Sequence, residues 1–438
     1  MPITIGASTR LINPEIGDDI CGQLHRRFCE YIHDDLEANL VYLRSGDEQV
    51  MLGSLDLAGL WVDDDLPRAR AAMAAATGLP ERSIILTCTH THEGPDTGGL
   101  LTEDSPKNEA YLARLQDALV SGAEEAVSGA RPARVGWGRG HAHVGFNRRL
   151  CWADGTHSMY GDSTRADFTG LEGPDDPEHS VLWAVDEEEG RPLAVAHGNC
   201  CHATCMEGEH FASADFPGEA RRLVREALGP LPVLYLQGDS GDTSPWNMLK
   251  VPYRHDGERR AREMGALLAG ETLRLMLESE PVADPVLSHA YEDLVLGVRM
   301  PTDEALALAR EINAQGNEGD KLWQWVLATY GALRLYDEFH AHPFDTAPVH
   351  AVRVGDWALL TNPCEMYCQF GLDAKRRSPA AVTAIAQLAD GFCGYCPTIY
   401  GQMGGGYSGD PIYWARLEPY AGYRMADTGA RLVNGLWR

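Results

Sequence analysis

The chain has 438 residues, with 37 Lys or Arg and 64 Asp or Glu, so its formal charge at pH 7 is −27. Such an acidic surface repels phosphate backbones and anionic lipids, and we therefore expect no nucleic acid and no membrane among its partners. The 44% of hydrophobic and 23% of charged residues are typical of a folded globular protein and exclude a largely disordered chain.

The sequence favours a cytoplasmic location. Residues 1–20 contain no basic start followed by an apolar run, and no stretch approaches the roughly 18 apolar residues that a membrane helix needs. The 11 cysteines are an odd number and are mostly scattered, which favours reduced thiols over a disulfide framework.

Strand and helix patterns alternate along the chain. Apolar, β-branched runs predict strands at 50–57, 83–88, 133–144, 193–197, 233–237 and 357–361, and helical spacing predicts helices at 66–76, 111–127, 217–228, 258–278 and 364–377. This alternation is typical of an α/β fold, and we expect mixed β-sheets flanked by helices. No linker, repeat or low-complexity tract divides the chain, so we expect one domain over residues 1–438.

The segment 302–341 departs from this alternation because it is nearly strandless and rich in helix-forming residues. It contains two aromatic clusters, Trp323 with Trp325 and Tyr330 with Tyr336. We interpret the segment as a helical insertion that covers a functional site. Alternatively, these aromatic side chains only pack the insertion against the rest of the protein.

Two histidines follow the strand predicted at 83–88, in the sequence THTHEGP at 89–95. Residues two apart in extended backbone point to the same side, so His90 and His92 can face one cavity beyond the strand end. Imidazole is a common zinc ligand, and the Gly-Pro turn ends the strand where ligands are needed. A purely structural role for the pair is the alternative.

Three further polar motifs follow predicted strands, and they read NCCHAT at 199–204, GDSGDTSP at 238–245 and NPCE at 362–365. Ligands of α/β sheets bind beyond the carboxyl ends of the strands. We therefore expect the four motifs to converge on one metal site at the strand ends.

Two of these motifs allow more than one interpretation. The first offers His202 as a ligand, or a thiol, or thiols that are simply buried small hydrophobes. The thiols in question are Cys200, Cys201 and Cys205. In the last motif, Glu365 is either a ligand or the third residue of a capping box that begins the helix predicted at 364–377.

In this order, the motifs resemble the catalytic domain of the neutral ceramidase family, zinc-dependent amidases that cleave the amide of N-acylsphingosine. The resemblance covers nearly the whole chain. It is carried by INPEIG at 12–17, HDDL at 33–36, HTHEGP at 90–95, FNRR at 146–149, SADFPG at 213–218, GDTSP at 241–245, NPCE at 362–365, and Gly394 and Tyr395 with Tyr407 twelve residues later.

The resemblance implies a Zn²⁺ site and a set of catalytic residues. The implied zinc ligands are His90, His202, Glu365 and Tyr395. The implied catalytic residues are His92 as a proton carrier, Arg148 and Tyr407 as holders of the substrate carbonyl, and Ser244 at the position of the family's active-site serine. Zinc of this kind lowers the pKa of a bound water from 15.7 to about 7 and polarises the carbonyl.

Three departures from the family point away from ceramide as the substrate. Glu93 stands where the family usually has Ser, and glycines at 404–406 replace a Glu-rich loop after Tyr395. We also expect no counterpart of the family's C-terminal β-sandwich domain. A carboxylate at Glu93 needs a partner, which we expect to be a polar or cationic substrate group, Arg148 or Arg149.

Two other histidine pairs have the spacing of His90 and His92 without the Gly-Pro turn, and we do not expect them to bind the metal. They are His141 with His143 and His340 with His342.

The sequence therefore predicts a zinc-dependent amidohydrolase that acts on a small-molecule or acyl-amide substrate and prefers short or polar amides to long-chain ceramide. An ester or lactone hydrolase that uses the same site is the first alternative. The second is a non-catalytic metal-binding or sensing protein, in which the thiol cluster would complete a closed four-coordinate site. Assembly into a homo-oligomer is compatible with the sequence.

Overall fold

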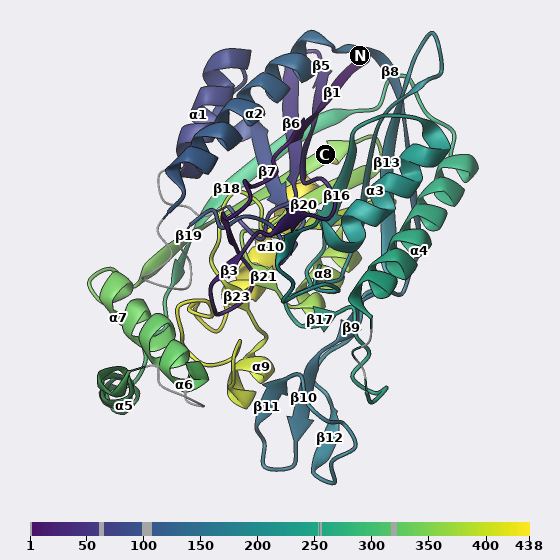
Figure 1. Cartoon of the computed structure of the whole chain (residues 1–438). Helices are drawn as coiled ribbons and strands as arrows, with labels where there is room; N and C mark the ends of the chain where they lie inside the picture. Colours follow the sequence, from purple (N-terminus) through teal and green to yellow (C-terminus); the bar gives the residue numbers. More distant parts are fainter. Residues whose placement is uncertain (1, 61–64, 99–106, 253, 255, 317–321) are drawn as a thin grey trace.

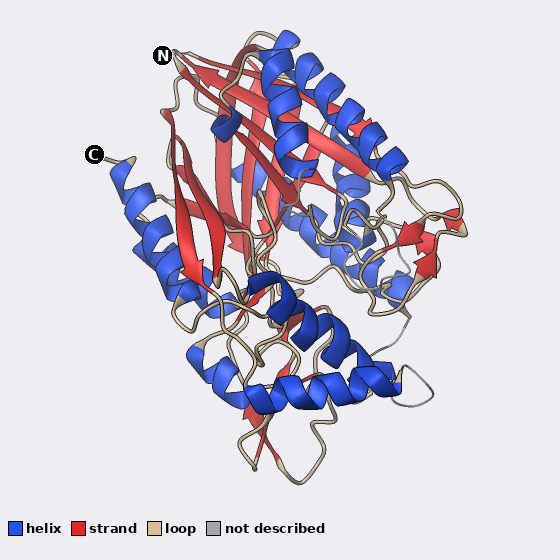
Figure 2. Cartoon of the chain, turned by 90° about the vertical axis from the view of Figure 1, so that its left-hand side faces the viewer, coloured by secondary structure: helices blue, strands red, loops and turns tan. Residues whose placement is uncertain are grey.

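The computed structural model describes residues 2–60, 65–98, 107–252, 254, 256–316 and 322–438. At its centre two β-sheets pack face to face, with helices on both outer sides (Figure 1, Figure 2). The larger sheet contains, in spatial order, β16 (Val233–Gln237), β14 (Pro192–Asn199), β13 (Glu178–Asp186), β8 (Arg131–His141), β1 (Ile3–Leu11), β5 (Glu37–Ser45), β6 (Glu48–Leu55) and β7 (Ile84–Cys88). The smaller sheet contains β18 (Leu287–Gly297), β19 (Phe344–Val354), β20 (Trp357–Thr361) and β22 (Val382–Ala386).

Both sheets mix parallel and antiparallel neighbours. The pairs β14 with β16, β6 with β7 and β20 with β22 are parallel, and the remaining neighbours are antiparallel. The mixed α/β architecture predicted from the sequence is confirmed, and each predicted strand is present at nearly the predicted boundaries.

Strand β5 shows that the two faces of the larger sheet contribute to two different hydrophobic cores. Successive residues of a strand point to opposite faces. Leu40 and Tyr42 accordingly lie in the core under the helices, whereas Val41 and Leu43 lie in the core between the two sheets. The inter-sheet core also contains Leu359 of the smaller sheet, so the two sheets are held together by buried apolar side chains.

Helices cover the outer faces of both sheets (Figure 1). On the larger sheet, α2 (Glu109–Ser128) packs on β1 and β5 beside α1 (Asp65–Thr77), while α3 (Asp215–Leu228) packs on β16 and α4 (Gly257–Glu278) on β8 and β13. On the smaller sheet lie α8 (Cys368–Arg377) and α10 (Ala421–Gly435). No helix in the described part of the chain combines the length and apolarity that crossing a bilayer requires.

The helix predicted at 364–377 begins later than expected, at Cys368. Before it, the chain forms the short strand β21 (Glu365–Met366), which pairs in parallel with β23 (Tyr395–Cys396). The capping-box interpretation of Glu365 is therefore wrong, because pairing with a distant segment overrides the local helix signal. The side chain of Asn362 instead accepts the N–H of Cys364 at 3.0 Å, within the turn that precedes β21.

The described part of the segment 302–341 is helical, as predicted. It contains α5 (Asp303–Gln315), α6 (Leu322–Val326), a π-helical segment (Leu327–Leu333) and α7 (Arg334–Phe339), and residues 317–321 of the predicted insertion lie outside the described residues. Figure 1 shows these helices at the lower end of the molecule, near α9 (Ile399–Gly404) and the small sheet of β10 (Arg149–Trp152), β11 (His157–Met159) and β12 (Phe168–Leu171).

The chain that follows β22 joins both edges of the larger sheet. The N–H of Gln387 donates to the carbonyl of Gln237 on edge strand β16 at 2.8 Å. The N–H of Asp390 donates to the carbonyl of Leu86 on the opposite edge strand β7 at 2.9 Å. Loops that follow strands far apart in the sheet order are therefore brought to one place, and the predicted polar motifs lie in these loops.

Candidate metal centre

Two imidazoles from distant parts of the sequence face each other. The Nε2 atoms of His90, which follows β7, and His202, which follows β14, lie 2.9 Å apart, and both side chains are buried. Nδ1 of His90 contacts the carbonyl of Ala58, and Nδ1 of His202 lies 2.9 Å from the carbonyl of Ser240. Because a carbonyl only accepts hydrogen bonds, Nδ1 carries the proton in both rings and each Nε2 presents a lone pair.

A cation already stands beside these nitrogens, because Nη2 of Arg148 lies 3.2 Å from Nε2 of His202. Burial and the neighbouring Arg148 lower the pKa of His202 to about 3, so this ring is neutral at pH 7 and cannot itself supply the proton. Oε2 of Glu365 lies 3.3 Å from both Nε2 atoms and accepts no hydrogen bond from the described residues. Two imidazoles and a carboxylate are a donor set that suits Zn²⁺, and they fit a metal ion here.

Glu365 is ionised in this environment. Burial by itself raises the pKa of its carboxyl group, but the imidazoles of His90 and His202 outweigh burial and hold the pKa well below its usual range. The carboxylate therefore brings a negative charge to the site.

Tyr395 lies next to Glu365 because the two residues pair in strands β21 and β23. Its ring stacks parallel to that of His202, with 6.5 Å between the ring centroids, and its hydroxyl accepts a hydrogen bond from Arg148 at 3.3 Å. Burial, with the added effect of Glu365, raises the pKa of this phenol well above its usual range. A bound cation would act in the opposite direction and favour the phenolate.

His92 completes a group of three imidazoles. Its Nε2 lies 3.4 Å from Nε2 of His90, and the ligand atoms of His90, His92 and His202 all lie within 4.8 Å of one another. Burial and the other two imidazoles lower the pKa of His92 well below its usual range. The two rings meet at one point, as the sequence spacing predicted, but the backbone is not extended there, because His90 has a φ of 65°.

Arg148 and Tyr407 also reach this group. Arg148 donates from Nη2 to the carbonyl of Gly241 at 3.0 Å and from Nη1 to the hydroxyl of Tyr160 at 2.9 Å. The ring of Tyr407 lies 5.5 Å from that of Tyr395. Both side chains line the cavity beside the imidazoles.

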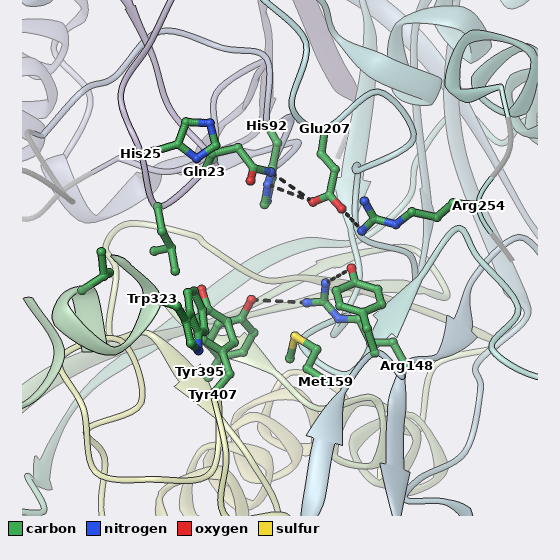
Figure 3. A pocket seen from close by; sticks show the side chains of 14 residues that line it. Gln23, His25, His92, Arg148, Met159, Glu207, Arg254, Trp323, Tyr395 and Tyr407 are labelled. Atoms are coloured by element: carbon green, nitrogen blue, oxygen red, sulfur yellow. Dashed lines mark hydrogen bonds and ion pairs between the residues drawn. The ribbon is translucent and has the colours of Figure 1, made fainter. Parts of the chain in front are cut away.

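This cavity has a volume of about 620 Å³. Figure 3 shows His25, Gln23, His92, Glu207 and Arg254 along one side and Trp323, Tyr395, Tyr407, Met159 and Arg148 along the other. A smaller cavity of about 50 Å³ adjoins it and is lined by His90, His92, Glu365, Tyr395 and Tyr407, among others. Of the candidate metal ligands, Tyr395 lines both cavities, and His90 and Glu365 line the smaller one.

Trp323 of the helical insertion lines this cavity and lies 5.7 Å from Tyr407, ring to ring. Trp325 and Tyr330, in contrast, pack against each other, with 5.3 Å between their ring centroids, and both also pack against the core. One aromatic residue of the insertion therefore borders the cavity, and two others pack the insertion against the core.

Ser244 is not brought to the cavity. It lies in the short strand β17 (Thr243–Ser244), is fully buried, and its Oγ accepts the N–H of Trp246 at 3.2 Å. It does not belong to the lining of either cavity beside the imidazoles.

The thiol cluster faces away from the imidazoles. The sulfurs of Cys200, Cys201 and Cys205 contact the carbonyl of Asp239, the carbonyl of Val144 and the sulfur of Met264, respectively. All three are buried, and the burial of Cys201 and Cys205 among apolar side chains matches the interpretation as small hydrophobes.

The other histidine pairs lie on the surface. His143 contacts Asp175 at 2.9 Å, and His340 stacks on Tyr336 with 4.6 Å between the ring centroids. All four residues of these pairs are exposed, and none of them lines the cavity.

The prediction about the partner of Glu93 is wrong. Its side chain is fully buried, does not line the cavity, and lies 3.8 Å from Nη1 of the equally buried Arg27. Arg149, one of the expected partners, instead binds Glu172 at 2.9 Å. Arg27 lies 66 positions before Glu93 and belongs to no motif, so the sequence offered no signal for this pair.

Several polar residues of the cavity were not predicted from the sequence, among them Gln23, Glu207 and Arg254. Gln23, Glu207 and Arg254 come from three loops, and none of them belongs to a motif whose spacing suggests chemistry. Only the folded chain places them beside His92 (Figure 3).

Two solved structures of ceramidases have the fold of this chain. The neutral ceramidase from Pseudomonas aeruginosa matches with a TM-score of 0.76 and 18% sequence identity, over 100% of this chain and 75% of that chain. A ceramidase complexed with C2 matches with a TM-score of 0.75 and 17% identity over the same shares. No protein-family model and no curated protein matches the chain. The chain therefore has a neutral ceramidase-like fold over its whole length, as the motifs predicted.

Proposed function

We propose that this chain is a zinc-dependent hydrolase that cleaves the C–N amide bond of a small or acylated molecule. The observation that carries the proposal is the pair of Nε2 lone pairs of His90 and His202, 2.9 Å apart beside the carboxylate of Glu365. His90 and Glu365 line the small cavity, which adjoins a larger one of about 620 Å³ with room for a substrate. The fold shared with ceramidases, which cleave an amide, supports the reaction class.

His90, His202, Glu365 and Tyr395 would hold the metal. When bound there, zinc would supply an activated water and polarise the carbonyl of the substrate. Arg148 and Tyr407 would hold that carbonyl oxygen, because both side chains face the cavity beside the ligands. His92 would transfer a proton to the leaving nitrogen, since its Nε2 points toward the ligand group.

The walls of the cavity suggest the substrate class. Trp323 and Met159 offer apolar surface, while Gln23, Glu207 and Arg254 offer hydrogen-bonding groups on the opposite side (Figure 3). We propose an amide with a short acyl or other apolar part and a polar part, and we propose that such amides are better substrates than long-chain ceramide. Glu93 no longer supports this preference, because its partner is Arg27.

We also propose a cytoplasmic location. All the cysteines of the chain are unpaired and buried, which suits a reducing compartment.

The test of the proposal is a substrate panel on purified protein loaded with zinc, with and without a chelator. We expect chelator-sensitive hydrolysis of small acyl amides. Hydrolysis of esters or lactones but not of amides would establish the first alternative, since the same site can attack the carbonyl of either kind of substrate. Tight zinc binding with no hydrolysis of any member of the panel would contradict the proposal and favour a metal-binding or sensing role.

A further inference from the structure

The carboxylate of Glu207 lies on the cavity wall between His92 and Arg254 (Figure 3). Its Oε2 is 3.9 Å from Nδ1 of His92 and 3.4 Å from the side-chain nitrogen of Gln23, and its Oε1 forms an ion pair with Arg254. The side chain is 12% exposed, so this is an inner wall of the cavity and not a surface ion pair.

His92 lacks the partner that orients each of the other two imidazoles. Nδ1 of His90 and Nδ1 of His202 are held by backbone carbonyls, whereas Nδ1 of His92 is buried and makes no hydrogen bond with the described residues. Its Nε2 faces the ligand group. A ring that must present Nε2 in one direction needs an acceptor at Nδ1, because that hydrogen bond fixes both the tautomer and the ring orientation.

We infer that Glu207 is the positioning residue for His92. A shift of about 1 Å brings its Oε2 from 3.9 Å to hydrogen-bond distance from Nδ1. The carboxylate would then accept the Nδ1 proton and leave Nε2 free to carry a proton in the reaction. This inference rests on the proposed function, in which His92 is the proton carrier.

Glu207 is itself held in place. The guanidinium of Arg254 pairs with Glu207 and lies over the ring of Tyr160, 5.0 Å from its centroid. The hydroxyl of Tyr160 in turn accepts a hydrogen bond from Arg148 at 2.9 Å. A continuous chain of contacts thus connects the residue that orients His92 with the residue that would hold the substrate carbonyl.

The test is a double-mutant cycle on zinc-loaded protein. Glu207→Ala should lower kcat by about 10 to 100-fold, the usual cost of removing such an outer partner, with zinc content nearly unchanged. Glu207→Gln retains an oxygen acceptor and should recover part of this loss. In a His92→Ala background, Glu207→Ala should change kcat no further, because its effect acts through His92.

Glu209→Ala is the matched control, since Glu209 is two positions along the same loop and exposed. An unchanged kcat in Glu207→Ala would overturn the inference, and so would an equal loss of kcat in the presence and absence of His92. In either case, activity of the wild-type protein would still support the proposed function.

A crystal structure of the zinc-loaded protein gives a readout that is independent of activity. We expect Nδ1 of His92 within about 3.2 Å of the Glu207 carboxylate, and a turned or disordered ring in Glu207→Ala. If wild-type protein hydrolyses no substrate, the proposed function fails, and this distance alone decides the inference. A distance beyond 3.5 Å in that structure would refute it.

Discussion

His90 and His202 face each other through Nε2 atoms that lie 2.9 Å apart, although 112 residues separate them in the sequence. Each ring is locked by a backbone carbonyl at its other nitrogen. The two lone pairs are therefore already aimed at one point in the folded protein, and a metal ion can bind without reorienting either ring.

Loss of either imidazole should abolish metal binding. We expect His90→Ala and His202→Ala to retain less than about a tenth of the zinc of the wild type, which should bind about one ion per chain. Metal analysis after gel filtration measures this directly. The exposed His143 provides the control, and His143→Ala should keep its zinc. Full zinc content in both test variants would show that the ligand assignment is wrong.

Removal of the metal should also lower thermal stability. A ligand that binds the folded state alone stabilises it by mass action, so chelation should lower the Tm of the wild type. The same chelator should leave the Tm of His90→Ala unchanged, because that variant has no metal to lose. Equal effects of the chelator on the two proteins would argue against zinc binding at His90.

His92→Ala should be nearly inactive yet retain its zinc. A general acid or base contributes about 10² to 10⁴-fold to turnover, and we expect a loss in this range. The control is His25→Ala, because His25 lines the same cavity but lies outside the imidazole group. Since Nε2 of His92 also lies 3.4 Å from that of His90, loss of zinc together with activity would make His92 a ligand.

Short or polar amides should be hydrolysed with a higher kcat/KM than long-chain ceramide presented in detergent. The polar wall of the cavity suits a hydrogen-bonding group, and a protein of charge −27 is repelled by anionic membranes that would deliver a lipid. Parallel kinetics with both kinds of amide check this expectation. A kcat/KM for ceramide that equals or exceeds the others would refute it.

Glu93 should make stability depend on pH. Burial, with Asp215 nearby, raises the pKa of Glu93 well above its usual value of 4.5. The folded state thus binds this proton more tightly than the unfolded chain, so the contribution to stability is complete below the unfolded pKa and is lost as pH rises through the folded pKa.

Replacing Glu93 by Gln should remove this dependence. Between pH 5 and 7, we expect the free energy of unfolding of the wild type to fall relative to Glu93→Gln by up to about 1.4 kcal/mol per pH unit, the value for one proton. Urea unfolding at several pH values measures the difference, with Glu209→Gln as the exposed control. Parallel curves for wild type and Glu93→Gln would show that Arg27 keeps the carboxylate charged.

The sequence determined the secondary structure and the chemistry-bearing positions well, because both depend on local pattern. Apolar periodicity located β7 and β14, and the spacing of His90 and His92 pointed to two imidazoles on one side, although the backbone at His90, with a φ of 65°, is not extended. The rule that ligands gather beyond strand ends led to the motif at 199–204, and the family resemblance selected His202 within it; the ring of His202 does meet the other two.

The tertiary structure decided the residues whose role depends on a distant partner. Glu365 has a good local signal for a helix cap, and only its pairing with Tyr395 places it in a strand beside the imidazoles. Glu93 meets Arg27, and Glu207 meets His92, across separations for which the sequence carries no pattern. Such contacts are set by how the sheets pack and how the loops between them close, and these are properties of the whole folded chain.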